Sequence, residues 1–74
     1  MIIFTQHSLL KLKQRKIPKS LVVKTVKNPD RILKSYSNRE VSYKKFSKLY
    51  LKVVYKKETK DIIVITQYWV KEIN

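Results

Sequence analysis

The chain of 74 residues contains no glycine, although average usage would supply about five, at roughly 7%. Tight turns must therefore be made by other residues, and Asn38 is the best candidate for a turn position with positive φ. The absence of glycine also excludes the phosphate-binding P-loop, the dinucleotide-binding G-x-G-x-x-G turn and the nucleophile elbow. The absence of cysteine excludes a disulfide framework, a zinc ribbon, an iron–sulfur site and a thiol nucleophile.

Positive charge is the second feature that limits the possible functions. The chain has 18 Lys and Arg residues and only 5 Asp and Glu residues, for a net charge of +13. Such a balance on a small body predicts attraction to a polyanion, which can be nucleic acid, an acidic protein or a membrane surface. Most of the cations are lysines, as AT-rich codons would produce. That bias exchanges Arg for Lys but does not explain why so few acids remain.

Neither a targeting segment nor a cofactor site is predicted. The opening Met1–Phe4 is too short for a signal peptide. The longest apolar run, Ile62–Ile65, falls far below the roughly 18 residues of a transmembrane helix. The single histidine and the scattered acids form no metal-ligand set. We therefore expect one cytoplasmic domain over residues 1–74, with no membrane partner, no metal and no cofactor.

The N-terminal part of the chain predicts a short edge strand and two helices. Residues 2–4 suit the strand, and Thr5 suits an N-cap because its hydroxyl can accept from the first turn of a helix over 6–16. Pro18 fits the start of a second helix, which ends near Lys27 because Asn28-Pro29 follows. The residues expected to point inward from the first helix are Leu9, Leu10 and Leu12.

From Arg31 onward the pattern indicates strands, over 31–36, 40–46, 49–57 and 61–70. In 49–55 apolar side chains alternate, which places Tyr50, Lys52 and Val54 on the face opposite Leu51 and Val53. We therefore predict an α+β domain in which two N-terminal helices pack on one face of a four-stranded antiparallel sheet. The other face would be exposed and populated by tyrosines and lysines.

Two groups of residues could carry chemistry. His7, Lys11 and Arg15 lie at helical spacing and form one stripe, in which a neutral imidazole could act as a base or bind phosphate. The alternative is an ordinary solvated helix edge. The second group, on the sheet, interleaves cations with aromatic rings, as single-stranded nucleic acid requires: Arg39, Tyr43, Lys44, Lys45, Tyr50, Lys52, Tyr68 and Trp69. The alternative places Trp69 and some of the tyrosines in the core.

RNA cleavage needs neither paired histidines nor paired carboxylates, because the substrate's own 2′-hydroxyl can attack the adjacent phosphate. The protein must align that attack, stabilise the added negative charge and protonate the leaving 5′-oxygen. Clustered Lys, Arg and Tyr side chains can do this, and crowding of like charges is expected to lower a lysine pKa toward the working range.

An ordered set of motifs resembles a small family of domains with the pattern T-x-H-(A/S)-x-x-(R/K)-x-x-x-R-x-(I/V), then N-P-(D/E), L-x-V-V and V-x-T-x-Y/W. The matching pieces here are Thr5-Gln6-His7-Ser8-Leu9, Lys11, Arg15, Ile17, Asn28-Pro29-Asp30, Leu51-Lys52-Val53-Val54 and Val64-Ile65-Thr66-Gln67-Tyr68-Trp69. This family resembles a branch of the RelE/ParE-type toxin superfamily, with two helices packed on an antiparallel sheet. Lys11 stands where Arg is usual, and Lys16 where Gly usually ends the first helix.

The resemblance implies a toxin-like ribonuclease or RNA-binding domain, acting on free or ribosome-bound RNA and paired with an acidic antitoxin. We assign catalytic roles to His7, Lys52 and Tyr68, and RNA binding to Lys11, Arg15, Arg39, Lys44, Lys45, Tyr50 and Thr66. In this hypothesis Lys52 holds phosphate with Lys45 or Arg39, His7 or Tyr68 moves protons, and Tyr50 stacks on a base.

Two alternatives stay open at this point. One is a nucleic-acid-binding module without catalysis, and the other is a protein-interaction module whose exposed sheet face meets an acidic partner or a second copy of itself. The superfamily also contains members that poison gyrase, so the resemblance does not by itself establish an endoribonuclease. The sequence leaves the oligomeric state undetermined.

Overall fold

A computed structural model describes residues 1–73 and shows an α+β domain with two helices and one sheet. The elements follow the chain as β1 (Ile2–Phe4), α1 (Gln6–Arg15), α2 (Lys19–Lys27), β2 (Arg31–Lys34), β3 (Arg39–Phe46), β4 (Leu49–Glu58) and β5 (Asp61–Val70). The strand and helix positions predicted from the sequence are confirmed to within two residues at each end.

The sheet has five strands in the order β1-β5-β4-β3-β2. Strands β2 to β5 are antiparallel to their neighbours, whereas β1 pairs with β5 in parallel, with Ile2 opposite Ile62 and Phe4 opposite Val64. The prediction of a four-stranded antiparallel sheet was therefore wrong. The expected edge strand at residues 2–4 is confirmed. Its parallel partner β5 lies at the far end of the chain, and no local pattern reveals such a pairing.

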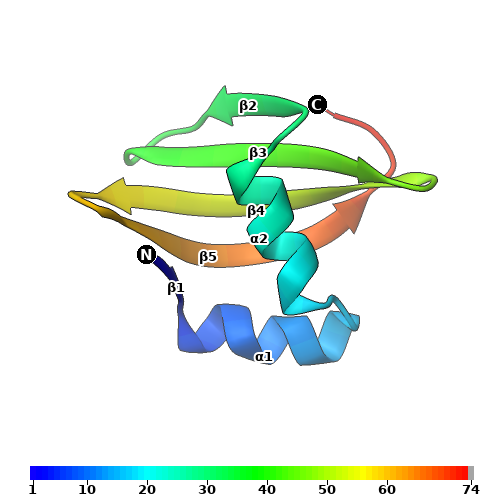
Figure 1. Cartoon of the computed structure of the whole chain (residues 1–74), viewed down its shortest axis with the longest axis horizontal. Helices are drawn as coiled ribbons and strands as arrows, with labels where there is room; N and C mark the ends of the chain where they lie inside the picture. Colours follow the sequence, from blue (N-terminus) through cyan, green and yellow to red (C-terminus); the bar gives the residue numbers. More distant parts are fainter. Residues whose placement is uncertain (74) are drawn as a thin grey trace.

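Both helices pack on one hydrophobic core, in different ways. Helix α2 crosses the front of the sheet, whereas α1 runs along β5 at the edge of the sheet beside β1 (Figure 1). The core cluster joins Leu12 of α1 and Val22 of α2 to Leu51 and Val53 of β4 and to Val64 of β5. The opposite face of the sheet, called the open face below, carries no helix in the described residues 1–73 (Figure 1).

Residues other than glycine make the tight turns. The Thr5 hydroxyl accepts a hydrogen bond of 3.1 Å from the Ser8 amide, which confirms the predicted N-cap. Lys16 adopts a left-handed conformation with φ 52° and ends α1 in the position where glycine usually stands. Asn38 has φ 59°, as predicted, and Ser37 beside it has φ 60°. A left-handed conformation costs such residues roughly 1–2 kcal/mol each, so these turns hold only because the flanking elements are packed.

The side of α1 that faces the core differs from the prediction. Leu12 is buried, but Leu9 and Leu10 are 41% and 54% exposed, so their expected inward orientation was wrong. The fully buried residue one turn before Leu12 is Ser8, whose hydroxyl donates to Gln67 Oε1 over 2.6 Å. Since side chains four residues apart share a helix face, this polar anchor rotates the two leucines toward solvent.

The alternation predicted in β4 is confirmed, with Leu51, Val53 and Tyr55 buried toward the helices. Trp69 packs against the core, its ring edge-to-face with Phe46 at 6.1 Å, so the core interpretation of Trp69 is correct. Within residues 1–73 no helix is long and apolar enough to cross a membrane.

Candidate nucleic-acid interface

One row of side chains crosses the open face from strand to strand. The register places Arg31 of β2 opposite Tyr43, Tyr43 opposite Lys52, and Lys52 opposite Tyr68 of β5. Residues directly opposite each other in antiparallel strands point to the same face. With Arg15 of α1 beyond Tyr68, these residues form an alternating series of cations and tyrosines, called the central row below.

Lys52 occupies the middle of the central row, between two aromatic rings. Its ammonium nitrogen lies 5.8 Å from the centre of the Tyr43 ring and 5.2 Å from the centre of the Tyr68 ring. Both distances fall within the range of cation–π attraction. Tyr43 is only 2% exposed, so its ring packs against Lys52 and has little surface left for stacking on a base.

The pKa of Lys52 is raised above its ordinary value. The main cause is the polar contact of its ammonium with the Tyr68 hydroxyl, which outweighs the opposing effect of partial burial, and Tyr43 adds to the increase. The expectation that like charges would lower a lysine pKa therefore does not apply to Lys52, whose row neighbours are tyrosines. Lys52 stays a cation at neutral pH and is suited to holding an anion and unsuited to taking a proton.

Arg15 packs against Tyr68 on the side away from Lys52. Its Nη1 donates to the Gln67 carbonyl oxygen over 2.8 Å and to the Thr66 hydroxyl over 3.3 Å, and its guanidinium carbon lies 5.5 Å from the centre of the Tyr68 ring. Strand β1 pairs with β5 only as far as Val64. Beyond that point the Arg15 side chain, in place of a neighbouring strand, donates to the Gln67 backbone carbonyl at the edge of β5. This contact brings the guanidinium to the open face.

A buried polar pair sets the position of α1 and therefore of Arg15. The Ser8 hydroxyl donates to Gln67 Oε1 over 2.6 Å, and Gln67 Nε2 donates to the Ser8 carbonyl over 3.0 Å. Both residues are fully buried. The amide group of Gln67 thus joins the first turn of α1 to the strand that carries Tyr68 one residue later.

A second cation–tyrosine pair lies next to the central row, toward the β3–β4 turn. Lys45 and Tyr50 are opposite each other, and the Lys45 ammonium lies 5.9 Å from the centre of the Tyr50 ring. The Asp30 carboxylate accepts from the backbone amide of Lys45 over 2.8 Å and fixes this part of β3. Tyr50 is half-buried, so part of its ring can stack on a base.

Acids gather at the opposite end of the sheet, where most of them are paired. Glu40 lies 3.7 Å from the Lys57 ammonium, and Glu58 lies 2.9 Å from the Lys56 ammonium. Asp61 lies 3.5 Å from the N-terminal ammonium. No member of the central row is an acid, and the carboxylate nearest to the Lys45–Tyr50 pair is that of Asp30, which accepts from the Lys45 amide.

The predicted helix stripe does not converge on the central row as a unit. Arg15 reaches Tyr68, but Lys11 donates to Gln14 Oε1 over 3.0 Å along its own helix. His7 is exposed in the first turn of α1. Arg15 follows His7 by eight positions, a distance of about 12 Å along the helix axis.

The predicted binding residues of the sheet do not all lie on the open face near the central row. Lys44 points to the helix side, where its ammonium donates to the Asn28 carbonyl over 3.0 Å and lies 3.8 Å from the Asp30 carboxylate. Arg39 begins β3 at the end of the sheet that holds the acids, about 13 Å along the strand from Tyr43. Lys45, Tyr50, Lys52, Thr66 and Tyr68 share the open face.

Arg31 is the member of the central row that sequence reasoning missed. It is the first residue of β2 and lies opposite Tyr43. Its role depends on the β2–β3 register, and the candidate strand over 31–36 carried no alternation strong enough to predict that register. Tyr43 was among the predicted sheet residues, and the core was the alternative for some of the tyrosines. Its burial under Lys52 follows only from the packed sheet.

Comparison with known families gives one match. Residues 4–69 match the model of a family described as a domain of unknown function, DUF4258. The chain belongs to this family. The matched range includes every residue of the central row. No curated protein and no solved structure matches the chain.

Proposed function

We propose that this protein is a toxin-like domain of the cytoplasm that binds single-stranded RNA on its open face and cleaves it through attack of the RNA's own 2′-hydroxyl. The observation that carries the proposal is the central row, in which Lys52 lies between two tyrosines and Arg15 lies beyond Tyr68. The sequence resemblance to RelE/ParE-type toxins supports the same function, and an acidic antitoxin is the partner that it implies.

Binding follows from the chemistry of the open face. The cations Lys52, Arg15 and Lys45 provide charge for phosphates, and the exposed parts of Tyr50 and Tyr68 provide rings for unpaired bases. Bases in a duplex are stacked on one another, so they cannot reach rings on a sheet. A single strand is therefore the form of RNA that fits this surface.

Cleavage would use the centre of the same row. The 2′-oxygen attacks phosphorus, the bond from phosphorus to the 5′-oxygen breaks, and the products are a 2′,3′-cyclic phosphate and a 5′-hydroxyl. Lys52 and Arg15 would stabilise the added negative charge on the phosphate oxygens. The proton that leaves the 2′-hydroxyl and the proton that the 5′-oxygen gains must pass through a nearby group.

Tyr68 is the better candidate for that proton transfer. It lies between Lys52 and Arg15, with the Lys52 ammonium 5.2 Å and the Arg15 guanidinium carbon 5.5 Å from the centre of its ring. His7 lies about 12 Å along α1 from Arg15 and is exposed. A role for His7 would require the RNA to extend along α1, and the His7→Ala variant tests this directly.

The decisive experiment incubates the purified protein with an end-labelled single-stranded RNA and with the same RNA carrying one 2′-deoxynucleotide. We expect cleavage of the all-ribose strand into products with 2′,3′-cyclic phosphate ends. A 2′-deoxynucleotide should abolish cleavage on its 3′ side only. Cleavage that persists at the deoxy position would contradict the mechanism, because no 2′-oxygen is present there to attack.

The same samples separate the other candidate functions. Salt-dependent binding without products, on free RNA and on ribosome-bound RNA alike, would make the protein a binding module without catalysis. A salt-resistant complex with an acidic protein that masks the open face, combined with no affinity for RNA, would make it a protein-interaction module. Induced expression of wild type beside Lys52→Ala and His7→Ala shows whether growth arrest depends on either residue.

A further inference from the structure

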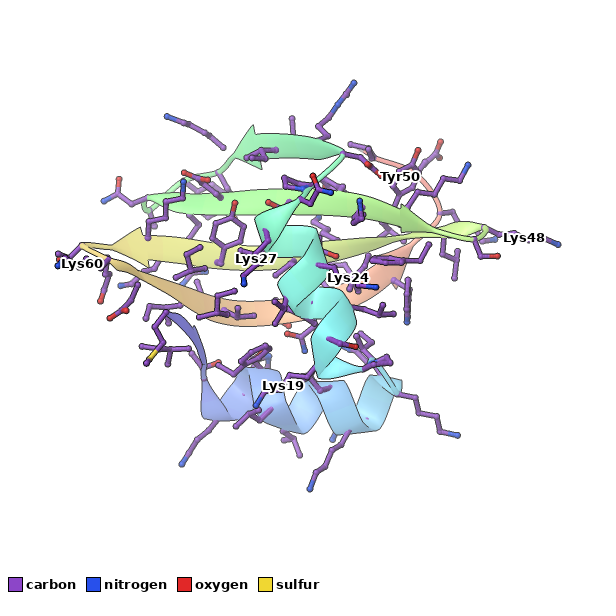
Figure 2. The ribbon with its side chains drawn as sticks, viewed as in Figure 1. Lys19, Lys24, Lys27, Lys48, Tyr50 and Lys60 are labelled. Carbon is purple, nitrogen blue, oxygen red and sulfur yellow. The ribbon has the colours of Figure 1, made fainter. Side chains whose placement is uncertain are left out.

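A second basic surface lies on the opposite side of the molecule, along α2. Figure 2 labels Lys19, Lys24 and Lys27 on this helix, which crosses the front of the sheet. All three side chains are exposed. From residue 6 to residue 27 the chain contains no Asp or Glu, so neither helix carries an acid that could neutralise them.

The two basic surfaces are physically separate. The molecule measures 19 Å along its shortest axis, which is the direction of view in Figure 1. At physiological ionic strength the Debye length is about 8 Å. The cations on α2 are therefore largely screened from those of the central row, and one extended strand cannot contact both surfaces without turning around an edge of the sheet.

The chemistry of the α2 surface favours a phosphate backbone over a protein partner. Its outward positions are Ser20, Lys24 and Lys27, with Lys19 beside them and Val23 half-buried. Protein interfaces depend on aromatic or apolar anchors buried at their centre. The outward positions offer none, although an apolar hollow lined by Met1, Ile2, Val23, Lys27 and Ile62 borders them on the side of β1. Lysines without such anchors provide the sequence-independent attraction that phosphates require.

We propose that the protein binds two segments of RNA at once, one on the open face and one along α2, and so bridges them. This inference rests on the proposed function, since it takes RNA as the ligand of the open face. The α2 surface would bind the RNA backbone without stacking on bases, so it tolerates a duplex as well as a single strand. A molecule with this property would act between neighbouring strands of a folded RNA.

The test measures stoichiometry by native mass spectrometry with a uridine hexanucleotide, which is short enough to occupy one surface and has no self-complementarity. We expect the wild-type chain to bind two hexanucleotides. The variant Lys24→Gln/Lys27→Gln should bind one, because the α2 surface then lacks two of the cations that would contact phosphates. The variant Lys52→Gln/Lys45→Gln should also bind one.

A matched control removes the same charge elsewhere. Lys34→Gln/Lys60→Gln lowers the net charge equally, at the end of the sheet that holds Glu40, Glu58 and Asp61, and should still bind two. One hexanucleotide on the wild-type chain, or two on the α2 variant, would overturn the bridging inference and leave RNA binding by the open face standing. No binding by the wild-type chain would overturn both proposals.

Discussion

The Lys52 ammonium lies 5.2 Å from the centre of the Tyr68 ring, directly across the β4–β5 register, and no carboxylate takes part in this contact. A lysine on a protein surface is commonly held by an acid, which also neutralises it. Here the rings of Tyr43 and Tyr68 hold the ammonium while leaving its charge uncompensated. Lys52 is therefore both fixed in position and available to an anion.

Removing the charge of Lys52 should weaken RNA binding at least about tenfold, because a hydrogen bond to a charged group contributes about 1.5–3 kcal/mol. Lys52→Met tests this by fluorescence anisotropy with a labelled single strand at fixed salt. Lys60→Met serves as the control for the loss of one charge, since Lys60 lies in the β4–β5 turn. Equal affinities of the two variants would show that Lys52 has no special role.

Removing only the Tyr68 hydroxyl should separate binding from cleavage. We expect Tyr68→Phe to bind RNA nearly as well as wild type, because the ring remains between Lys52 and Arg15. Its cleavage rate should fall by roughly 10²–10⁴, the usual contribution of a positioned acid or base. Single-turnover rates with saturating protein measure this, and an unchanged rate would remove Tyr68 from the mechanism.

The Ser8–Gln67 pair should contribute to stability. Gln67→Ala leaves the Ser8 hydroxyl and carbonyl buried without their partner, so we expect the free energy of unfolding to fall by about 1–3 kcal/mol. Urea denaturation checks the value. The exposed Gln6, on the same helix, is the control, and Gln6→Ala should change stability by less than about 0.5 kcal/mol. Equal effects of the two substitutions would mean that the pair does not anchor α1.

The two types of leucine on α1 should respond differently to truncation. Leu12 is 8% exposed within the core cluster, whereas Leu10 is 54% exposed. Leu12→Ala should destabilise the fold by about 2–5 kcal/mol, and Leu10→Ala by less than about 0.5 kcal/mol. Thermal unfolding followed by circular dichroism distinguishes them, and a large loss at Leu10 would restore the inward orientation that the sequence suggested.

Stability should decline at alkaline pH for two reasons. Burial raises the pKa of Tyr55, and contact with Tyr68 raises that of Lys52, so in both cases the folded state holds its proton longer than the unfolded state. Their contributions are complete below the unfolded pKa of each group and are lost as pH rises through the folded value. Urea midpoints should therefore be flat from about pH 7 to about pH 9 and fall above about pH 10.

An absorbance titration provides the matching measurement for the tyrosines. Tyr55 should ionise at a higher pH in the folded protein than in the urea-unfolded chain, because burial raises its pKa. Ser42→Ala removes a hydroxyl that lies 2.8 Å from the Tyr55 hydroxyl and lowers its pKa, so this variant should delay ionisation further. Ionisation of Tyr55 at the same pH in the folded and the unfolded protein would contradict the burial of Tyr55.

Local features of the fold could be predicted because each depends on a few neighbouring residues. The N-cap at Thr5 follows from its hydroxyl, and the end of α2 follows from Asn28-Pro29. The two faces of β4 follow from the alternation of Leu51, Lys52 and Val53. These signals have periods of two to four residues, so the sequence contains them in full.

The remaining features depend on pairings between distant parts of the chain. Strand β1 pairs in parallel with β5, and Arg15 donates a hydrogen bond to the Gln67 carbonyl, so both contacts join opposite ends of the chain. The outward orientation of Leu9 and Leu10 also depends on such a contact, because Ser8 is bonded to Gln67. In the candidate site, the order of residues along the strands predicted cations interleaved with tyrosines and placed Tyr50 and Lys52 on one face. Only the strand register placed Lys52 between Tyr43 and Tyr68, because a shift of one residue would have turned these side chains to the other face.

The sequence by itself therefore determined the excess of positive charge, the order of helices and strands, and the types of side chain that a ligand would meet. The tertiary structure decided which cations remain without acids and which of them lie together. The physical reason is that charge and propensity belong to single residues and short segments, whereas a binding surface depends on the geometry between strands. In this chain, that geometry is set by the sheet register and by the Ser8–Gln67 pair.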